Sequence, residues 1–328
     1  MPAKKIILIT TTSFQDVSGI HHDLLDREQY QLIRQRGPLS EDAMLDLVGE
    51  VDGMICGDDA ITPAVIDKAL PRLQVISKYG IGLDKIDVDY VTEQGIPLTF
   101  CPGVNHTTVA EHSFTLLLSL CKNLLPQAND SARGLWNRNT GHEIFGKRML
   151  ILGMGRIGKE VAIRARAFGM EVTGYNRSWD DSFAQAHNIS RITDIESALP
   201  QTEIVSLHLP FTEDTHNLIN TDRLALLPQG AYVINTGRGE LVDAQAVVDA
   251  LESGHLGGYG ADVLDQEPPP TNHPLLRAPR CVITPHVGSR TYESVARQAE
   301  MATRNLILTM NGKKPLAQAN NAPLPTTH

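Results

Sequence analysis

The chain has no excess of basic residues. Its 328 residues include 29 Lys and Arg against 38 Asp and Glu, which gives a formal charge of −9 at pH 7. A protein that binds nucleic acid or an acidic membrane surface needs positive charge to engage phosphates. We therefore expect no nucleic acid and no membrane among its partners, although a local basic site is compatible with this balance.

Cysteines are few, and long apolar segments are missing. The four cysteines form no C-x-x-C pair, so neither a zinc site nor a disulfide framework is indicated. No segment approaches the ~20 apolar residues of a membrane-spanning helix. The first five residues lead directly into an apolar strand, without a longer apolar segment for export. We expect a cytoplasmic protein with reduced thiols and no metal site.

Apolar sequence is plentiful and alternates between strands and helices. Hydrophobic residues make up 41% of the chain and charged residues 20%, as in proteins with a substantial core. The alternation predicts an α/β fold with two doubly wound parallel sheets. Six strands from Met149 onward match the count of a complete dinucleotide-binding sheet. The predicted strands are residues 6–9, 30–33, 54–56, 73–77, 98–100, 149–152, 172–175, 204–209, 231–235, 258–263 and 281–284.

The length of the chain predicts two domains, because one domain has roughly 100–200 residues. We place the crossings after residues 102 and 289. A helix predicted over residues 292–310 returns to the first domain. Residues 1–102 and 290–328 then form a discontinuous, flavodoxin-like substrate domain, and residues 103–289 form a Rossmann dinucleotide-binding domain. The tail from residue 313, rich in Pro, Ala, Asn and Thr, is expected to fray.

The pattern G-x-G-x-x-G lies between an apolar strand and a helical segment, at Gly153, Gly155 and Gly158. This context favours a βαβ dinucleotide-binding unit over a purely structural turn. Gly153 allows the tight turn, Gly155 lets a pyrophosphate approach, and Gly158 lets helix and strand pack closely. The helix that begins with Arg156 and Ile157 presents free N–H groups and a partial positive charge to phosphates.

A second glycine-bearing loop, residues 79–84, follows the fourth predicted strand. Ligands of open α/β sheets bind beyond the carboxyl ends of strands. This loop is therefore a candidate site for a small anion, although an ordinary turn explains its two glycines equally well.

Three polar residues follow the last three predicted strands: Arg238, Glu267 and His286. Taken singly, they fit a surface arginine, a loop carboxylate and a histidine bonded to backbone. Together they fit hydride transfer to a 2-oxo acid. Histidine can donate a proton to the carbonyl oxygen near neutral pH. A carboxylate on the other ring nitrogen fixes its tautomer, and the planar donors of arginine match a substrate carboxylate.

These motifs resemble the D-isomer-specific 2-hydroxyacid dehydrogenases, which include phosphoglycerate dehydrogenases, glyoxylate and hydroxypyruvate reductases and formate dehydrogenases. The resemblance covers nearly the whole chain, through residues 80–84, 105–112, 153–158, 235–239, 262–268 and 285–289. It implies that Arg238, Glu267 and His286 are catalytic. It also implies that the Gly80 and Ile81 amides, with Arg238, bind the substrate carboxylate.

The resemblance further implies a cofactor site and a partner subunit. Asp262 is expected to meet the nicotinamide carboxamide. The whole implied cofactor set is Thr108, Gly153, Gly155, Arg156, Ile157, Gly158, Asn176, Arg177, Ser178, Pro210, Thr236, Gly237, Asp262, His286, Gly288 and Ser289. Family members are usually dimers that close through residues 110–136, and a long polar connection follows Trp136. We therefore expect a homodimer.

One departure from the family pattern concerns the cofactor. Relatives that prefer NAD carry an aspartate at the position of Asn176, where it binds the ribose 2′-hydroxyl and repels a 2′-phosphate. Here Arg177 and Ser178 offer a cation and a hydroxyl instead. We predict NADP(H) over NAD(H); the alternative is that Arg177 points to solvent and NAD binds.

Other departures concern the substrate. Formate dehydrogenases carry a glutamine at the position of Glu267, which makes formate a poor candidate. Phosphoglycerate dehydrogenases tend to have basic residues where this chain has Gly57, Asp58 and Asp59, and two carboxylates would repel a phosphate. We predict reduction of a small 2-oxo acid of the glyoxylate or hydroxypyruvate type, or oxidation of the 2-hydroxy acid.

Two alternatives stay open. Arg133 and Arg138 could compensate the charge of the two aspartates. A phosphoglycerate dehydrogenase, or another dehydrogenase of phosphorylated or sugar-derived 2-hydroxy acids, is therefore the second candidate. A nucleotide-sensing scaffold, similar to the corepressors that resemble this family, is the more remote one.

Overall fold

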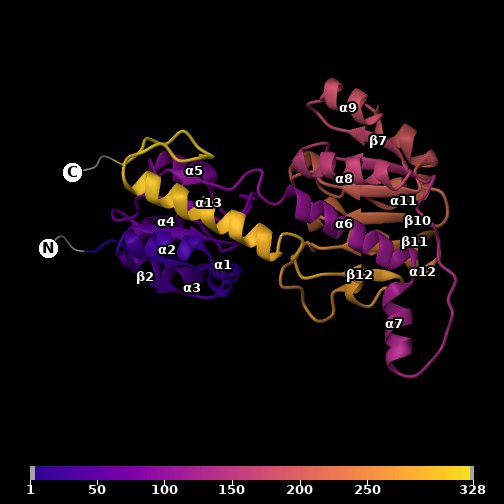
Figure 1. Cartoon of the computed structure of the whole chain (residues 1–328), viewed down its shortest axis with the longest axis horizontal. Helices are drawn as coiled ribbons and strands as arrows, with labels where there is room; N and C mark the ends of the chain where they lie inside the picture. Colours follow the sequence, from indigo (N-terminus) through magenta and orange to yellow (C-terminus); the bar gives the residue numbers. More distant parts are fainter. Residues whose placement is uncertain (1–3, 326–328) are drawn as a thin grey trace. The chain divides into compact units, whose positions relative to one another are not determined.

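The computed structural model describes residues 4–325. The chain folds into two compact units (Figure 1). Unit 1 comprises Met1–Asn105 and Arg290–His328, and unit 2 comprises His106–Ser289. The expected substrate domain and dinucleotide-binding domain stay predictions, because the compactness of a unit does not say what it binds.

Over residues 4–105 and 290–325, unit 1 is built on a five-stranded parallel sheet in the order β2-β1-β3-β4-β5. Since all neighbours are parallel, the carboxyl ends of these strands share one edge. The fourth strand starts later than the predicted 73–77, because Leu73 still donates its N–H to Ala69 at the end of the preceding helix. The strands are β1 Ile6–Ile9, β2 Gln31–Arg34, β3 Gly53–Cys56, β4 Ile76–Lys78 and β5 Leu98–Thr99.

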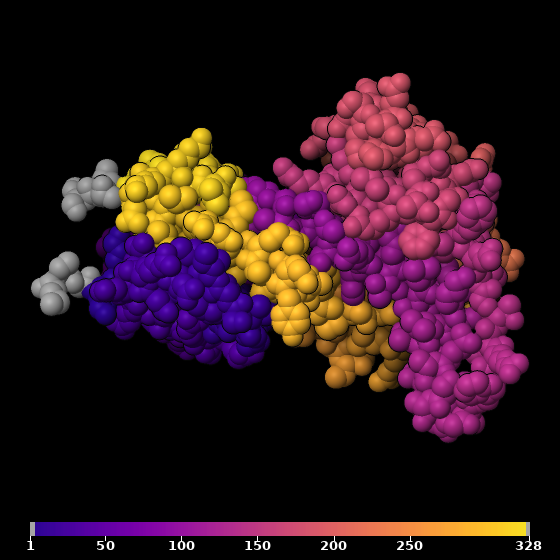
Figure 2. Space-filling view, in the orientation of Figure 1, coloured from indigo at the N-terminus to yellow at the C-terminus, as the bar shows by residue number. Residues whose placement is uncertain are grey.

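Helices cover this sheet, and residues that favour helix starts stand at the beginning of two of them. Ser40 and Thr62 cap α3 and α4 by accepting from the N–H three residues on, and Pro63 opens α4. The last helix, α13, returns from the far end of the chain to pack on β3, β4 and α2. Figure 2 shows its yellow atoms beside the indigo N-terminal residues of unit 1. The helices are α1 Thr12–Asp16, α2 Ile20–Arg27, α3 Glu41–Leu45, η1 Val48–Glu50, α4 Pro63–Ala69, α5 Val88–Glu93 and α13 Tyr292–Met310.

The tail after α13 is bonded to the rest of unit 1 through residues 316–320, so the expectation that it frays was wrong there. Buried Asn305 on α13 accepts from Leu316 N (2.8 Å) and Ala317 N (3.3 Å). Ala319 N donates to Leu98 O, and the side-chain oxygen of Asn320 accepts from Leu98 N. The composition of the tail did not reveal this, because its partners are backbone groups more than 200 residues away and one buried amide. Residues 326–328 lie outside the described residues.

Unit 2 contains, among the residues that the structure describes, a seven-stranded parallel sheet in the order β12-β11-β10-β9-β6-β7-β8. The sequence predicted six of these strands. It missed β8 because this strand has only two residues, both exposed, and therefore no apolar pattern. The strand order reverses at β6, which is where ligands of open α/β sheets bind. The strands are β6 Arg148–Leu152, β7 Glu171–Tyr175, β8 Ser190–Arg191, β9 Ile204–Leu207, β10 Ala231–Asn235, β11 Leu256–Ala261 and β12 Cys281–Ile283.

The two faces of this sheet carry separate hydrophobic cores. On one face, α6 and α8 pack together against the sheet. Glycines in β11 make room for α6, since a Cβ on Gly260 would lie 3.1 Å from the Cβ of Leu116. The helices are α6 His106–Cys121, α7 Leu124–Ala132, α8 Arg156–Ala167, α9 Asp181–His187, α10 Ile195–Ala198, η2 Leu199–Gln201, η3 Glu213–Thr215, α11 Thr221–Leu226, η4 Gly239–Leu241, α12 Ala244–Glu252 and η5 Pro274–Leu276. Over residues 4–325, no helix has the length and apolar character needed to cross a membrane.

Candidate active site

The glycine-rich loop joins β6 to α8, and its three glycines differ in what surrounds them. Gly153 has φ +104°, and a Cβ there would lie 2.6 Å from the carbonyl carbon of His208. A Cβ on Gly158 would lie 2.0 Å from Gly153 O. Nothing lies within 4 Å of a Cβ on Gly155, which caps α8. Two glycines are therefore required by packing, whereas the space at Gly155 and the N–H groups that open α8 fit an incoming phosphate.

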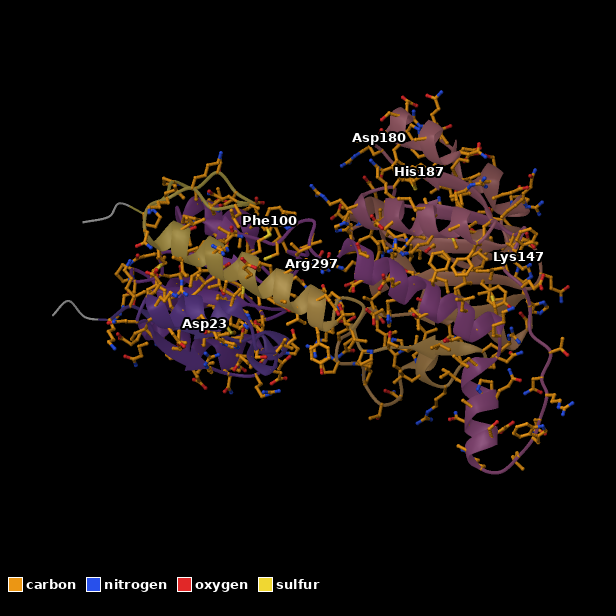
Figure 3. All side chains as sticks on the ribbon, in the orientation of Figure 1. Asp23, Phe100, Lys147, Asp180, His187 and Arg297 are labelled. Carbon is orange, nitrogen blue, oxygen red and sulfur yellow. The ribbon has the colours of Figure 1, made fainter. Side chains whose placement is uncertain are left out.

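The segment after β7 carries no carboxylate at its first position. The side-chain amide of Asn176 donates to the carbonyl of Ser178, two residues further on. Arg177 and Ser178 are both exposed. The next acidic residue, Asp180, is labelled in Figure 3 and caps α9. It forms an ion pair with Lys159 at 2.5 Å. The nearest carboxylate along the chain is thus engaged by a lysine of α8.

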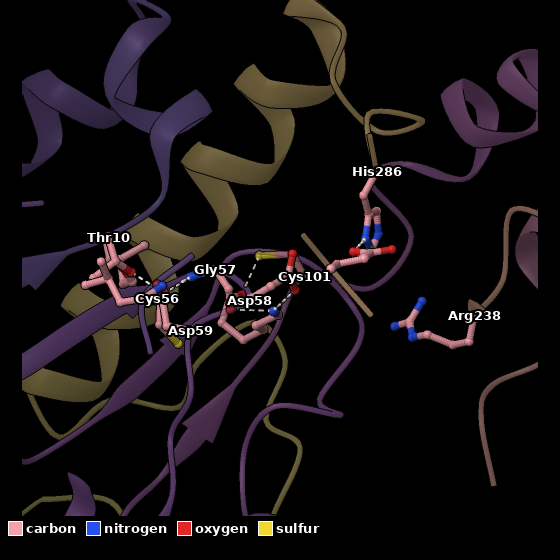
Figure 4. A network of polar contacts seen from close by, with 12 residues as sticks. Thr10, Cys56, Gly57, Asp58, Asp59, Cys101, Arg238 and His286 are labelled. Carbon is pink, nitrogen blue, oxygen red and sulfur yellow. Dashed lines mark hydrogen bonds and ion pairs between the residues drawn. The ribbon is translucent and has the colours of Figure 1, made fainter. Parts of the chain in front are cut away.

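His286 and Glu267, from the loops after β12 and β11, form a hydrogen-bonded pair. Nδ1 of His286 lies 2.7 Å from Oε2 of Glu267 (Figure 4). The other oxygen of Glu267 accepts from Leu264 N at 3.0 Å, so the carboxylate is anchored to its own loop. This arrangement fixes the imidazole tautomer and leaves Nε2 on the far side of the ring from Glu267.

The backbone of His286 is itself held in the left-handed region, at φ +52°. Its N–H donates to Asp262 O at 2.8 Å. The Asp262 carboxylate, nearly fully buried, collects donors from the histidine loop: Val287 N at 2.9 Å and Gly288 N at 2.7 Å. Asp262 therefore positions the loop that carries His286.

Two further side chains complete the surroundings of Asp262. Thr284 donates to it at 2.6 Å, and His112 of α6 lies 3.3 Å from its Oδ1 and 2.8 Å from the Thr284 hydroxyl. Burial raises the pKa of Asp262, but hydrogen bonds from His112, Thr284 and the loop N–H groups outweigh it and hold the pKa below its usual value. The sequence did not single out His112 or Thr284.

Arg238 lies on the neighbouring loop after β10, and the side chain of Asn235 holds the backbone of this loop. Asn235 accepts from Gly237 N (3.0 Å) and donates to Arg238 O (2.8 Å). A Cβ on Gly239 would lie 2.0 Å from the carbonyl carbon of Leu264, so this loop packs directly on the loop of Glu267. The loops that carry the three predicted catalytic residues are therefore joined to one another at one edge of the unit 2 sheet.

A partly buried histidine that the sequence did not single out lies next to the loop of Arg238. His208 follows β9 and shares its ring nitrogens with Ser206 (2.8 Å) and Thr236 (3.2 Å), and Thr236 also meets Ser113 of α6 (2.9 Å). Burial lowers the pKa of His208 to about 3. His208 is therefore neutral near pH 7, and its backbone lies beside Gly153 of the glycine loop. The signal for it in the sequence was its position one residue past a strand.

The remaining predicted residues divide between the two units. Thr108 is buried on α6, and Pro210 is exposed after β9. Gly80 and Ile81 belong to unit 1, whereas the other predicted site residues belong to unit 2. Gly80 has φ +128°, and its carbonyl accepts from Cys101 N at 2.8 Å. Within residues 4–325, no three His, Cys, Asp or Glu side chains gather as a metal site requires.

The fold and the site define a dinucleotide-dependent oxidoreductase. The model of the D-isomer specific 2-hydroxyacid dehydrogenase NAD binding domain matches residues 114–288, and the chain belongs to this family. The predicted fold class, family and enzyme class are thereby confirmed.

Named relatives lie within the same family. The chain is 37% identical to a glyoxylate reductase from Thermofilum pendens over 86% of this chain and 85% of that protein. It is 35% identical to a D-3-phosphoglycerate dehydrogenase from Methanocaldococcus jannaschii over 78% of this chain and 49% of that one. The crystal structure of a protein from Thermus thermophilus superposes with a TM-score of 0.87 at 36% identity, covering 96% of this chain and 99% of the other.

Proposed function

We propose that this enzyme reduces a small 2-oxo acid of the glyoxylate or hydroxypyruvate type, or oxidises the corresponding D-2-hydroxy acid in reverse. The observation that carries the proposal is the His286–Glu267 pair at 2.7 Å, on a loop next to that of Arg238. A relative named glyoxylate reductase, at 37% identity over most of the chain, supports the substrate class.

In this proposal the three side chains have separate tasks. Nε2 of His286 donates a proton to the substrate carbonyl oxygen as that oxygen gains charge, and takes it back in the reverse direction. Glu267 holds Nδ1–H and stabilises the imidazolium. Arg238 binds the substrate carboxylate, which the amides of Gly80 and Ile81 hold as well. When bound, the nicotinamide supplies the hydride.

The residues proposed to hold the dinucleotide fit such a ligand. Gly155 opens onto free space at the N-terminus of a 12-residue helix, which suits a pyrophosphate. The full proposed set is Thr108, Gly153, Gly155, Arg156, Ile157, Gly158, Asn176, Arg177, Ser178, Pro210, Thr236, Gly237, Asp262, His286, Gly288 and Ser289. The carboxylate of Asp262 already accepts from two N–H groups of the loop that carries His286. In this proposal the same carboxylate also accepts from the amide of the nicotinamide carboxamide.

We further propose that NADP(H) is preferred over NAD(H). The support is the absence of a carboxylate at Asn176 and the exposure of Arg177 and Ser178 beside it. An exposed guanidinium and a hydroxyl suit a 2′-phosphate, and no negative charge at Asn176 repels it.

A homodimer is proposed as the working form. No residue of α7 is buried, and this helix and the chain after it protrude from the rest of unit 2 (Figure 1). The protruding segment and its surroundings expose Leu124, Leu125, Leu135, Trp136 and Phe145, with Trp136 77% exposed. Apolar surface of this kind suits a second copy of the chain. We propose a cytoplasmic location, which the four free thiols support.

A dehydrogenase of phosphorylated 2-hydroxy acids is the second candidate, favoured by the relative named D-3-phosphoglycerate dehydrogenase. A panel of 2-oxo acids, with and without phosphate, assayed with NADPH and with NADH, tests both candidates through their kcat/KM ratios. Reduction of glyoxylate or hydroxypyruvate in preference to 3-phosphohydroxypyruvate supports the first. Failure to reduce any member of the panel would overturn both.

A further inference from the structure

The loop after β3 in unit 1 contains two consecutive aspartates with different surroundings. Asp59 is fully buried and anchors the loop (Figure 4). Its carboxylate accepts from Leu39 N (2.8 Å), from Gly57 N (2.9 Å) and from the hydroxyl of Thr10. Asp58 keeps its side chain 60% exposed. The anchored loop therefore presents one carboxylate to solvent at the carboxyl end of β3.

A buried lysine lies against this exposed carboxylate. The side chain of Lys78, the last residue of β4, is 3% exposed. Its ammonium donates to Oδ1 of Asp58 at 2.7 Å and to Gly57 O at 2.5 Å. A buried ammonium needs a partner of opposite charge. Asp58 thus balances the charge of Lys78.

This ion pair is next to the loop proposed to bind the substrate carboxylate. Cys56 and Lys78 are register partners in the parallel strands β3 and β4. Asp58 and Gly80 each lie two residues past a paired position, at the same edge of the sheet. A Cβ on Gly80 would lie 3.5 Å from Cε of Lys78, so the lysine side chain passes directly beside Gly80.

We propose that Asp58 is a specificity-determining residue, which selects 2-oxo acids whose substituent beyond the carbonyl carries no negative charge. This inference rests on the proposed function. Because Asp58 neutralises Lys78, the ion pair offers no net attraction to an anionic substituent, which Lys78 alone would attract. Glyoxylate and hydroxypyruvate meet the condition, and the 3-phosphate of 3-phosphohydroxypyruvate does not.

The test compares hydroxypyruvate with 3-phosphohydroxypyruvate in the wild-type enzyme and in Asp58→Asn. Asparagine removes the charge and keeps an oxygen that can accept from Lys78. We expect the ratio of kcat/KM for the phosphorylated over the unphosphorylated substrate to rise about tenfold in the variant, because the positive charge of Lys78 is then no longer neutralised by Asp58. The gain should shrink at high ionic strength, since salt screens the attraction between Lys78 and the phosphate.

Glu50→Gln is the matched control. Glu50 is an exposed carboxylate paired with Arg72 at 2.7 Å, and it precedes β3 whereas Asp58 follows it. This substitution removes the same charge from the other edge of the sheet, so the substrate ratio should not change.

The outcomes separate this inference from the proposed function. An active wild-type enzyme with the same substrate ratio in wild type and Asp58→Asn overturns the inference alone. A wild-type enzyme that reduces neither compound overturns the proposed function, and the inference with it. If Asp58→Asn does not fold, Asp58→Ser removes the same charge with a shorter acceptor, and an unchanged ratio in that variant is equally decisive against the inference.

Discussion

The strand-end loops of the two units are anchored by the same device and present different groups. In unit 2, buried Asp262 accepts from two N–H groups of the loop that carries His286. In unit 1, buried Asp59 accepts from two backbone N–H groups and holds the loop that carries Asp58. A buried carboxylate past a parallel strand thus serves as a loop anchor in both sheets, and the side chain it presents decides what the loop can do.

The largest expected effect tests the unit 2 side of this comparison. In His286→Asn the proposed proton donor is lost, so kcat with hydroxypyruvate should fall about a thousandfold, within the range of general acid catalysis. Steady-state kinetics measure the loss, and cofactor titration by fluorescence should show binding largely retained. The control is His187→Asn, at the end of α9 (Figure 3), which should leave kcat within about twofold because it lies outside the proposed site.

The next effect separates glycines required by packing from the one that faces open space. A Cβ on Gly158 would lie 2.0 Å from a backbone oxygen, so Gly158→Ala should lower the free energy of unfolding by about 3 kcal/mol. Gly155→Ala should fold normally but raise the Kd for the dinucleotide, since its surroundings are open. Denaturant unfolding and cofactor titration measure the two changes. Equal stability losses in both variants would contradict the assignment.

A third pair of variants asks whether the two anchors are equivalent. Asp262→Asn and Asp59→Asn each replace a carboxylate oxygen, which accepts hydrogen bonds, with an NH2 group, which cannot accept from the backbone N–H groups around it. Each substitution should therefore lower the free energy of unfolding by about 2 kcal/mol. Urea titration measures it. Only Asp262→Asn should also lower kcat, because only its loop carries the proposed proton donor.

The pH dependence of stability follows from the lowered pKa of Asp262. A carboxyl whose folded pKa is below its unfolded value of about 3.9 stabilises the protein above that value. This contribution disappears as the pH falls through the folded pKa. The stability difference between wild type and Asp262→Asn should therefore be constant near neutral pH and narrow below about pH 4. A difference that grows on acidification would contradict the proposed anchoring.

The smallest expected effect concerns the cofactor. Asn176→Asp adds a negative charge at the end of β7, so it should shift the kcat/KM ratio of NADPH to NADH toward NADH by about tenfold. Arg177→Ala should shift the ratio in the same direction if the guanidinium binds the 2′-phosphate. A wild-type enzyme that prefers NADH would overturn the proposed preference before any variant is made.

Most of the fold could be predicted from the sequence, since apolar runs and caps are local signals. The strand at 231–235 and the helix at 292–310 have the predicted bounds. The two-residue β8 carries no such signal. The tail is held by hydrogen bonds with Asn305 and Leu98, and the local sequence of the tail does not reveal these partners.

The candidate site was predictable in position because parallel strands bring their carboxyl ends to one edge. This places Arg238, Glu267 and His286 on joined loops, although their roles stay predictions. The anchors were not predictable in the same way. Asp262 is in contact with His112, which lies on a helix 150 residues earlier in the chain. Asp58 is paired with Lys78, which lies on the next strand. Such long-range polar contacts leave no periodic trace in the sequence.

The most direct test of the account is a double-mutant cycle on kcat between Glu267→Gln and His286→Asn. If the 2.7 Å pair works as one proton-transfer unit, Glu267→Gln should slow the wild-type enzyme by about a hundredfold and add almost nothing to His286→Asn. Strictly multiplicative losses, or full activity in His286→Asn, would contradict the claim that this pair carries the chemistry.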